Sequence, residues 1–222
     1  MNIIEIYGMR RSGNHAIISW LKHNFDKKYG KEKVIYINDI MNNHSVKNEL
    51  FNQRIEQILS TDTQLLILSY EDVPCEITRL DASFKTTKFA VVRDIINLSA
   101  SRFKANTGVG MRIDEKFVER WKGHATYPLI IKYEDFLLSK EARDLFCKRF
   151  EVENIDITND LHYCSNIGSS FIGKNIDTIE NYLSRYKMIE LPENLKNIID
   201  TPEVNQIREK LGYPNFCLSD QN

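Results

Sequence analysis

Hydrophobic positions along the chain alternate between two patterns. Continuous apolar runs of strand length are typical of strands buried on both faces of a parallel sheet. Apolar residues at helical spacing lie between and after these runs. The predicted strands are Ile3–Tyr7, Val34–Ile37, Leu65–Tyr70, Phe89–Val92 and Leu129–Ile131. The predicted helices are His15–Lys28, Val46–Leu59, Asn97–Ala105, Glu115–Lys122, Lys140–Phe150, Ile179–Tyr186, Glu193–Ile199 and Pro202–Leu211.

This alternation predicts an α/β fold, because strands separated by helices form βαβ units with right-handed crossovers. We expect three layers, α/β/α, around a central and mostly parallel sheet. The length of 222 residues suits a single domain over 1–222. Its core is expected in 1–150, followed by a C-terminal loop and helices in 151–222. The polar stretch Ile155–Lys174 predicts a long ordered loop of the kind that often covers a site.

Composition excludes several classes of protein. A net charge of −1 and a pI near 6.5 do not fit nonspecific nucleic-acid binding, which needs a basic face. No run approaches the ~18 apolar residues of a membrane span, and the first strand starts too early for a signal peptide. The cysteines form no CxxC pair, so we expect reduced thiols, a cytoplasmic protein and no metal site. They are Cys75, Cys147, Cys164 and Cys217.

The loop after the first strand carries the strongest chemical signal. A strand, a glycine-containing loop and a helix surround a compact anion with backbone N–H groups and a helix N-terminus. Gly8-x-x-x-x-Gly13 has the outline of a P-loop, but Asn14 and His15 stand where nucleotide triphosphatases have Lys and Ser/Thr. The lysine and the magnesium-binding hydroxyl are therefore missing. The remaining groups suit a phosphate–sulfate bound without a metal, and they are Arg10, Arg11, Ser12, Gly13, Asn14 and His15.

A second element, Phe89–Phe103, places charge at the end of another buried strand. Arg93 follows the apolar run, and α/β ligands bind at the carboxyl ends of parallel strands. Ser101 lies eight residues further on, about two helical turns along the following helix. An arginine and a serine so arranged can share one phosphate.

These residues resemble the motifs of sulfotransferases that use 3′-phosphoadenosine-5′-phosphosulfate (PAPS), of the bacterial and cytosolic type. Arg11-Ser12-Gly13-Asn14-His15 is similar to the loop [K/R]-S-G-[T/S/N]-x with which that family opens. The resemblance implies that Arg11 holds the 5′-phosphosulfate and stabilises charge on the leaving oxygen. It implies that the residues from Ser12 to His15 bind the 5′-phosphate.

The second element resembles the family pattern V-R-[D/N]-P-x-x-x-x-x-S, with Ile95 in place of the usual proline. The resemblance implies that Arg93 and Ser101 bind the 3′-phosphate of PAPS. Segment 169–186 is similar to a C-terminal S-S-F…R-[W/Y] segment that folds over the nucleotide, which implies contacts from Ser170 and Arg185. Ile131–Phe136 is similar to a Y-E-D-L segment that is largely structural. The motif R-K-G-x-x-G-D-W-K of animal members is absent.

Sulfuryl transfer also needs a base for the acceptor proton. Leu65–Tyr70 predicts a buried strand that ends in two carboxylates, Glu71 and Asp72, followed by Val73-Pro74. In animal members a catalytic histidine follows the corresponding strand in a T-H-x-P context. A carboxylate beside a phosphosulfate has a raised pKa, which suits a general base. Glu71 and Asp72 are the candidate bases, in that order, and His15 is the rival.

The sequence thus predicts a PAPS-dependent sulfotransferase that releases adenosine 3′,5′-bisphosphate. The polar segments Asn38–Lys47 and Lys104–Ile113 at the ligand-facing edge suit a small polar acceptor with a hydroxyl or an amine. Two alternatives stay open. One is a P-loop kinase-like phosphotransferase, and the other is a non-catalytic nucleotide-binding protein. The acceptor and the oligomeric state do not follow from the sequence.

Overall fold

The computed structural model describes residues 2–40, 53, 55–58, 61–77, 80, 84, 86–105, 112–155, 183 and 185–214. Within this part of the chain, a sheet has the strand order β2-β3-β1-β4-β5. Every neighbouring pair runs parallel. The strands are β1 (Asn2–Gly8), β2 (Val34–Ile37), β3 (Leu65–Glu71), β4 (Thr86–Val92) and β5 (Ile130–Lys132). The prediction of five strands and a central parallel sheet is confirmed.

Register brings the functional segments to one edge of the sheet. Gly8, the last residue of β1, lies beside Glu71 of β3 and Val91 of β4. The loops that follow β1, β3 and β4 therefore start side by side at the carboxyl edge. In open α/β sheets this edge is where ligands bind.

The helices are confirmed close to their predicted bounds. Among the described residues they are α1 (Asn14–Tyr29), α3 (Ile95–Ala105), α4 (Glu115–Ala125), α5 (Tyr133–Leu138), α6 (Lys140–Arg149), α9 (Glu193–Ile199) and α10 (Pro202–Lys210). Two short 3₁₀ turns, η1 (Lys31–Lys33) and η2 (Arg185–Met188), complete this set. Helix α5 was not predicted, because its six residues follow β5 without a break.

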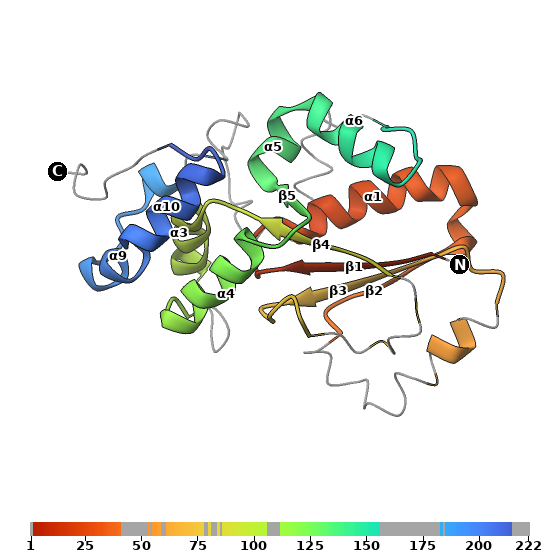
Figure 1. Cartoon of the computed structure of the whole chain (residues 1–222), viewed down its shortest axis with the longest axis horizontal. Helices are drawn as coiled ribbons and strands as arrows, with labels where there is room; N and C mark the ends of the chain where they lie inside the picture. Colours follow the sequence, from red (N-terminus) through yellow and green to blue (C-terminus); the bar gives the residue numbers. More distant parts are fainter. Residues whose placement is uncertain are drawn as a thin grey trace.

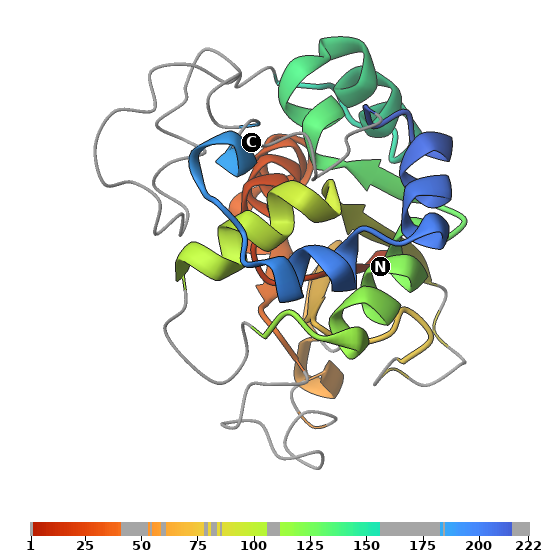
Figure 2. The ribbon, with the colours of Figure 1, turned by 90° about the vertical axis from the view of Figure 1, so that its left-hand side faces the viewer.

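Two apolar clusters cover the two faces of the sheet. On one face, α1, α5 and α6 pack over β1, β3 and β4 through Trp20, Phe136 and Phe146. Residues of α3, α4, α9 and α10 join the cluster on the opposite face. These four helices gather at the carboxyl ends of the strands (Figure 1), and Figure 2 shows them in front of the sheet. The architecture is α/β, with a parallel sheet flanked by helices.

Several sequence predictions fall partly outside the described residues. The predicted helix Val46–Leu59 is described only at 53 and 55–58, where the chain is helical. The predicted loop Ile155–Lys174 and most of the helix Ile179–Tyr186 lie outside. Cys75 and Cys147 are buried free thiols, whereas Cys164 and Cys217 lie outside the described part. Among the helices described, none is long and apolar enough to cross a bilayer.

Candidate functional site

The loop between β1 and α1 has a tight backbone that depends on two glycines. Arg11 and Gly13 have positive φ angles of 76° and 96°, and the Ser12 N–H donates to the Met9 carbonyl at 2.9 Å. A Cβ on Gly8 would overlap the Asn14 side chain, and one on Gly13 would overlap the Tyr133 ring. Close packing therefore fixes both ends of the loop, and α1 starts directly after it.

Two buried arginines hold consecutive carbonyls of this loop. The Arg93 Nη1 donates to the Arg11 carbonyl at 3.0 Å, and the Arg102 Nε donates to the Arg10 carbonyl at 3.1 Å. Arg93 and Arg102 are only 2% and 1% exposed. The structure thus brings together the loop and the end of β4, which the sequence places about 80 residues apart. The guanidinium of Arg93 also lies 5.3 Å from the centre of the Tyr133 ring, at a distance typical of cation–π contacts.

Asp72 anchors the loop from the end of β3. Its N–H donates to the Gly8 carbonyl at 3.0 Å, and its Oδ1 accepts from the Arg10 N–H at 3.2 Å. The same Oδ1 pairs with Arg102. Asp72 has a positive φ of 55°, which few non-glycine residues adopt. With these donors around it, Asp72 is placed to shape the loop.

Glu71 lies next to Asp72 but faces different groups. Its Oε1 lies 3.4 Å from the His15 Nε2, and its Oε2 lies 3.5 Å from the Arg10 Nε. Glu71 is 8% exposed, and burial raises the pKa of its carboxyl above the ordinary value. His15 and Arg10 oppose this rise in pKa, whereas Asp39 and Asp72 add to it. A carboxyl with a raised pKa beside the loop has the properties of a general base.

Arg11 has a guanidinium atom without a partner. Its Nε is buried, and among the described residues no hydrogen-bond acceptor reaches it. Arg10, by contrast, reaches Asp39 Oδ2 at 3.4 Å and Glu71. Because a buried N–H without an acceptor is costly, the orphaned atom fits an anionic ligand at the loop. Among the described residues, no group of His, Cys, Asp and Glu is arranged to hold a metal ion.

The other predicted site residues divide into three groups. Asn14 and Ser12 contact each other, with the Ser12 hydroxyl donating to the Asn14 Oδ1 at 2.6 Å. Ser101 is buried on α3, one residue before Arg102. Ser170 lies outside the described residues, and for Arg185 the structure describes only the backbone, at the start of η2. The predicted contacts of Ser170 and Arg185 with a nucleotide stay predictions.

Three residues brace the Arg93–Asp94 corner; sequence reasoning missed Trp121 and Arg208, whereas Glu134 lies in the segment expected to be structural. The Trp121 Nε1 donates to the Arg93 carbonyl at 2.9 Å. Arg208 of α10 pairs with both Asp94 oxygens, at 3.0 and 3.1 Å. The Asp94 N–H donates to Glu134 Oε1 at 3.1 Å. Three separate helices therefore fix the position of this corner. No sequence signal marks Arg208, because its partner lies 114 residues away.

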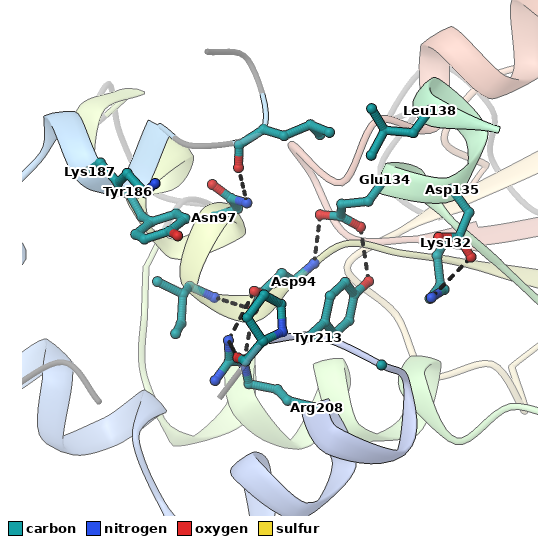
Figure 3. A pocket seen from close by; sticks show the side chains of 14 residues that line it. Asp94, Asn97, Lys132, Glu134, Asp135, Leu138, Tyr186, Lys187, Arg208 and Tyr213 are labelled. Carbon is teal, nitrogen blue, oxygen red and sulfur yellow. Dashed lines mark hydrogen bonds and ion pairs between the residues drawn. The ribbon is translucent and has the colours of Figure 1, made fainter. Parts of the chain in front are cut away.

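A cavity of about 550 Å³ opens next to this corner. Figure 3 shows it between Asp94 and Asn97 at the start of α3, Glu134 and Asp135 of α5, and the C-terminal residues Tyr186, Lys187, Arg208 and Tyr213. The Tyr213 hydroxyl donates to Glu134 Oε2 at 2.9 Å. Burial raises the pKa of Glu134 and of Tyr213. Neither Arg93, Ser101 nor any residue of 8–15 lines this cavity.

Comparison with known proteins gives limited information. No family model matches the chain, and no curated protein matches it. Among solved structures, the chain is similar to the mouse sulfotransferase SULT7A1 complexed with PAP. The two are 12% identical, with a TM-score of 0.48, and the match covers 95% of this chain and 83% of the other. At this level the similarity assigns neither family nor activity, so the functional conclusion has to rest on the site itself.

Proposed function

We propose that this chain is a sulfotransferase that moves the sulfuryl group of PAPS to a hydroxyl or amine of a small polar acceptor. One observation supports it most. The loop Arg11–His15 is joined to Arg93 by the hydrogen bond from Arg93 Nη1 to the Arg11 carbonyl. A carboxylate with a raised pKa, Glu71, contacts Arg10 and His15 of the same loop. Cations for a donor with two anionic groups and a base for an acceptor thus lie together.

In this proposal the reaction is an in-line displacement. The acceptor oxygen or nitrogen forms a bond to sulfur while the bond from sulfur to the 5′-phosphate oxygen breaks. The acceptor proton passes to Glu71, and adenosine 3′,5′-bisphosphate leaves. Arg11, whose Nε has no acceptor among the described residues, stabilises the charge that develops on the leaving oxygen.

We assign the remaining roles as part of the same proposal. Loop amides with Ser12, Asn14 and His15 hold the 5′-phosphate at the N-terminus of α1. Arg93 and Ser101 stay our proposed ligands of the 3′-phosphate. Asp72 serves as an anchor for the loop, because its carboxylate already pairs with Arg102 and accepts from the Arg10 N–H. Glu71 is therefore our proposed base.

The test is transfer of labelled sulfate from PAPS to a panel of small acceptors that carry hydroxyls or amines, in the presence of a metal chelator. We expect labelled product with at least one acceptor class. Arg11→Ala should abolish transfer without loss of folding. Arg149→Ala, an exposed arginine at the end of α6, is the matched control.

Two other results would contradict this assignment. Magnesium-dependent phosphate transfer from ATP would favour a kinase-like phosphotransferase, although the loop lacks its lysine and hydroxyl. Binding of adenosine 3′,5′-bisphosphate without transfer to any acceptor would favour a non-catalytic nucleotide-binding protein.

A further inference from the structure

Arg102 contacts both segments that form the site. Its Nε donates to the Arg10 carbonyl at 3.1 Å, its Nη2 pairs with the Asp72 carboxylate, and its guanidinium lies 4.8 Å from the centre of the Phe117 ring. The residue is 1% exposed. One side chain of α3 therefore connects the loop after β1 to the turn after β3.

The two connected segments both contain strained backbone. Arg11 and Asp72 have φ angles of 76° and 55°, which are unfavourable for residues with a Cβ. Such conformations persist only where the surroundings determine them strongly. Arg102 contributes to holding the backbone at both places, since it contacts the carbonyl that precedes Arg11 and the side chain of Asp72.

Holding a carbonyl also orients the next amide. A trans peptide keeps its C=O and N–H on opposite sides. When Arg102 fixes the Arg10 carbonyl, the Arg11 N–H points to the other side of the loop. Arg93 fixes the Arg11 carbonyl in the same manner. The two arginines thus set the orientation of consecutive peptide groups before any ligand arrives.

Arg102 also determines which carboxylate Arg10 faces. The Arg10 Nε lies 3.5 Å from Glu71 Oε2 and 3.8 Å from Asp72 Oδ2. While Arg102 neutralises Asp72, Arg10 is available to Glu71. Without Arg102, the unpaired Asp72 carboxylate would attract Arg10. The interaction of Arg10 with the Glu71 carboxylate would then weaken.

From this geometry we infer that Arg102 is a positioning residue, which holds the loop in its anion-binding shape and directs Arg10 towards Glu71. The inference rests on the proposed function for its effect on transfer. Its effect on the loop itself does not depend on that function. Burial supports a positional role, since apolar side chains in place of both Arg102 and Asp72 would avoid the cost of burying an ion pair.

The experiment compares Arg102→Met and Arg102→Lys with Arg143→Met. Arg143 of α6 is a matched control, because it is also buried and donates to backbone carbonyls, those of Phe136 and Leu137 in α5. Affinity for adenosine 3′,5′-bisphosphate is measured by calorimetry, and exchange of the loop amides 10–13 by hydrogen–deuterium mass spectrometry. Both measurements use conditions in which each variant is fully folded.

We expect Arg102→Met to weaken nucleotide binding about 10- to 100-fold and to speed exchange of the loop amides. It should also move the acid limb of the pH–rate profile to higher pH. Arg143→Met should lose stability but keep wild-type affinity and loop exchange. Arg102→Lys should resemble Arg102→Met, since one ammonium cannot take the place of a guanidinium that bridges two groups. If Arg102→Met does not fold, Arg102→Lys carries the test.

Wild-type loop exchange and affinity in Arg102→Lys would overturn the inference, as would equal losses of affinity in Arg102→Met and Arg143→Met. The experiment distinguishes failure of the proposed function from failure of the positioning role of Arg102. If the wild-type protein does not bind the nucleotide, the proposed function is wrong. In that case, loop exchange that is faster in the Arg102 variants but not in Arg143→Met would still support the positioning role.

Discussion

Glu71 has a carboxyl whose behaviour differs from that of a glutamate in water. Burial raises its pKa, and the neighbouring basic side chains of His15 and Arg10 offset only part of this rise. A group whose pKa is higher in the folded protein stabilises it at pH values below the unfolded pKa, near 4.3. That contribution is lost as the pH rises through the folded pKa. At neutral pH the Glu71 carboxylate therefore opposes folding.

We predict that Glu71→Gln raises the melting temperature at pH 8 and changes it little at pH 4. Thermal unfolding at the two pH values measures the difference. Glu153→Gln is the control, because this carboxylate is exposed and far from the loop in the sequence. An equal shift at both pH values, or a less stable variant at pH 8, would contradict the pKa direction. In the proposed reaction the same variant should lose about 100-fold or more in transfer.

Gly13 and Gly123 form a natural comparison. Gly13 has a φ of 96° and no room for a Cβ, whereas a Cβ on Gly123 of α4 would meet nothing within 4 Å. We predict that Gly13→Ala destabilises the protein by about 1–3 kcal/mol. Gly123→Ala should stabilise it by about 0.5–1 kcal/mol, because alanine favours helix interiors. Denaturant unfolding measures both, and a Gly13→Ala variant as stable as the wild type would show that the loop does not need this backbone.

Among the elements, α10 is attached to the Arg93–Asp94 corner by a buried ion pair. Arg208 and Asp94 have side-chain exposures of 3% and 8%, while Lys122 and Glu203 join α4 to α10 near the surface. Removing one partner of a buried pair leaves an uncompensated charge. Surface pairs contribute little.

We therefore predict that Arg208→Met costs about 3–5 kcal/mol of unfolding free energy. Lys122→Met should cost less than about 1 kcal/mol. Chemical denaturation of the two variants tests this contrast. Similar losses in both would mean that the buried pair does not hold α10 in place.

The strands were predictable because each contains a mainly apolar run of strand length, and in several of them polar residues follow that run. Leu65–Tyr70, for example, is followed by Glu71 and Asp72. Helix α5 was missed because its six residues are too few to show helical periodicity after β5. Strand order and register depend on pairings between distant segments, which a local pattern does not specify. The expectation of a mostly parallel sheet is confirmed, since each of its pairings is parallel.

The candidate site was predictable only in part. Local motifs marked the loop and Arg93, and the structure joins them by a hydrogen bond. Arg102 and Arg208 were missed, because their roles come from contacts made in the folded chain. One signal was present for Arg102. It is a charged residue in a largely apolar helix, Ile95–Ala105, next to Ser101, and such a residue is rarely buried without a partner.

Over the whole molecule, charge is nearly balanced at −1, yet arginines from β1–α1, β4 and α3 converge at one edge of the sheet. The function proposed for this edge requires a nucleotide with two anionic groups, one on the 3′ and one on the 5′ oxygen, but no divalent cation. ATP with magnesium should bind poorly, because the loop lacks the lysine and hydroxyl that hold its phosphates and metal.

Calorimetric titration with adenosine 3′,5′-bisphosphate in the presence of a chelator tests this most directly. We predict saturable binding at one site per chain, unchanged by magnesium, weakened strongly by Arg11→Ala and unaffected by Arg149→Ala. No binding of this nucleotide to the folded wild-type protein, or binding that Arg11→Ala leaves intact, would contradict the account.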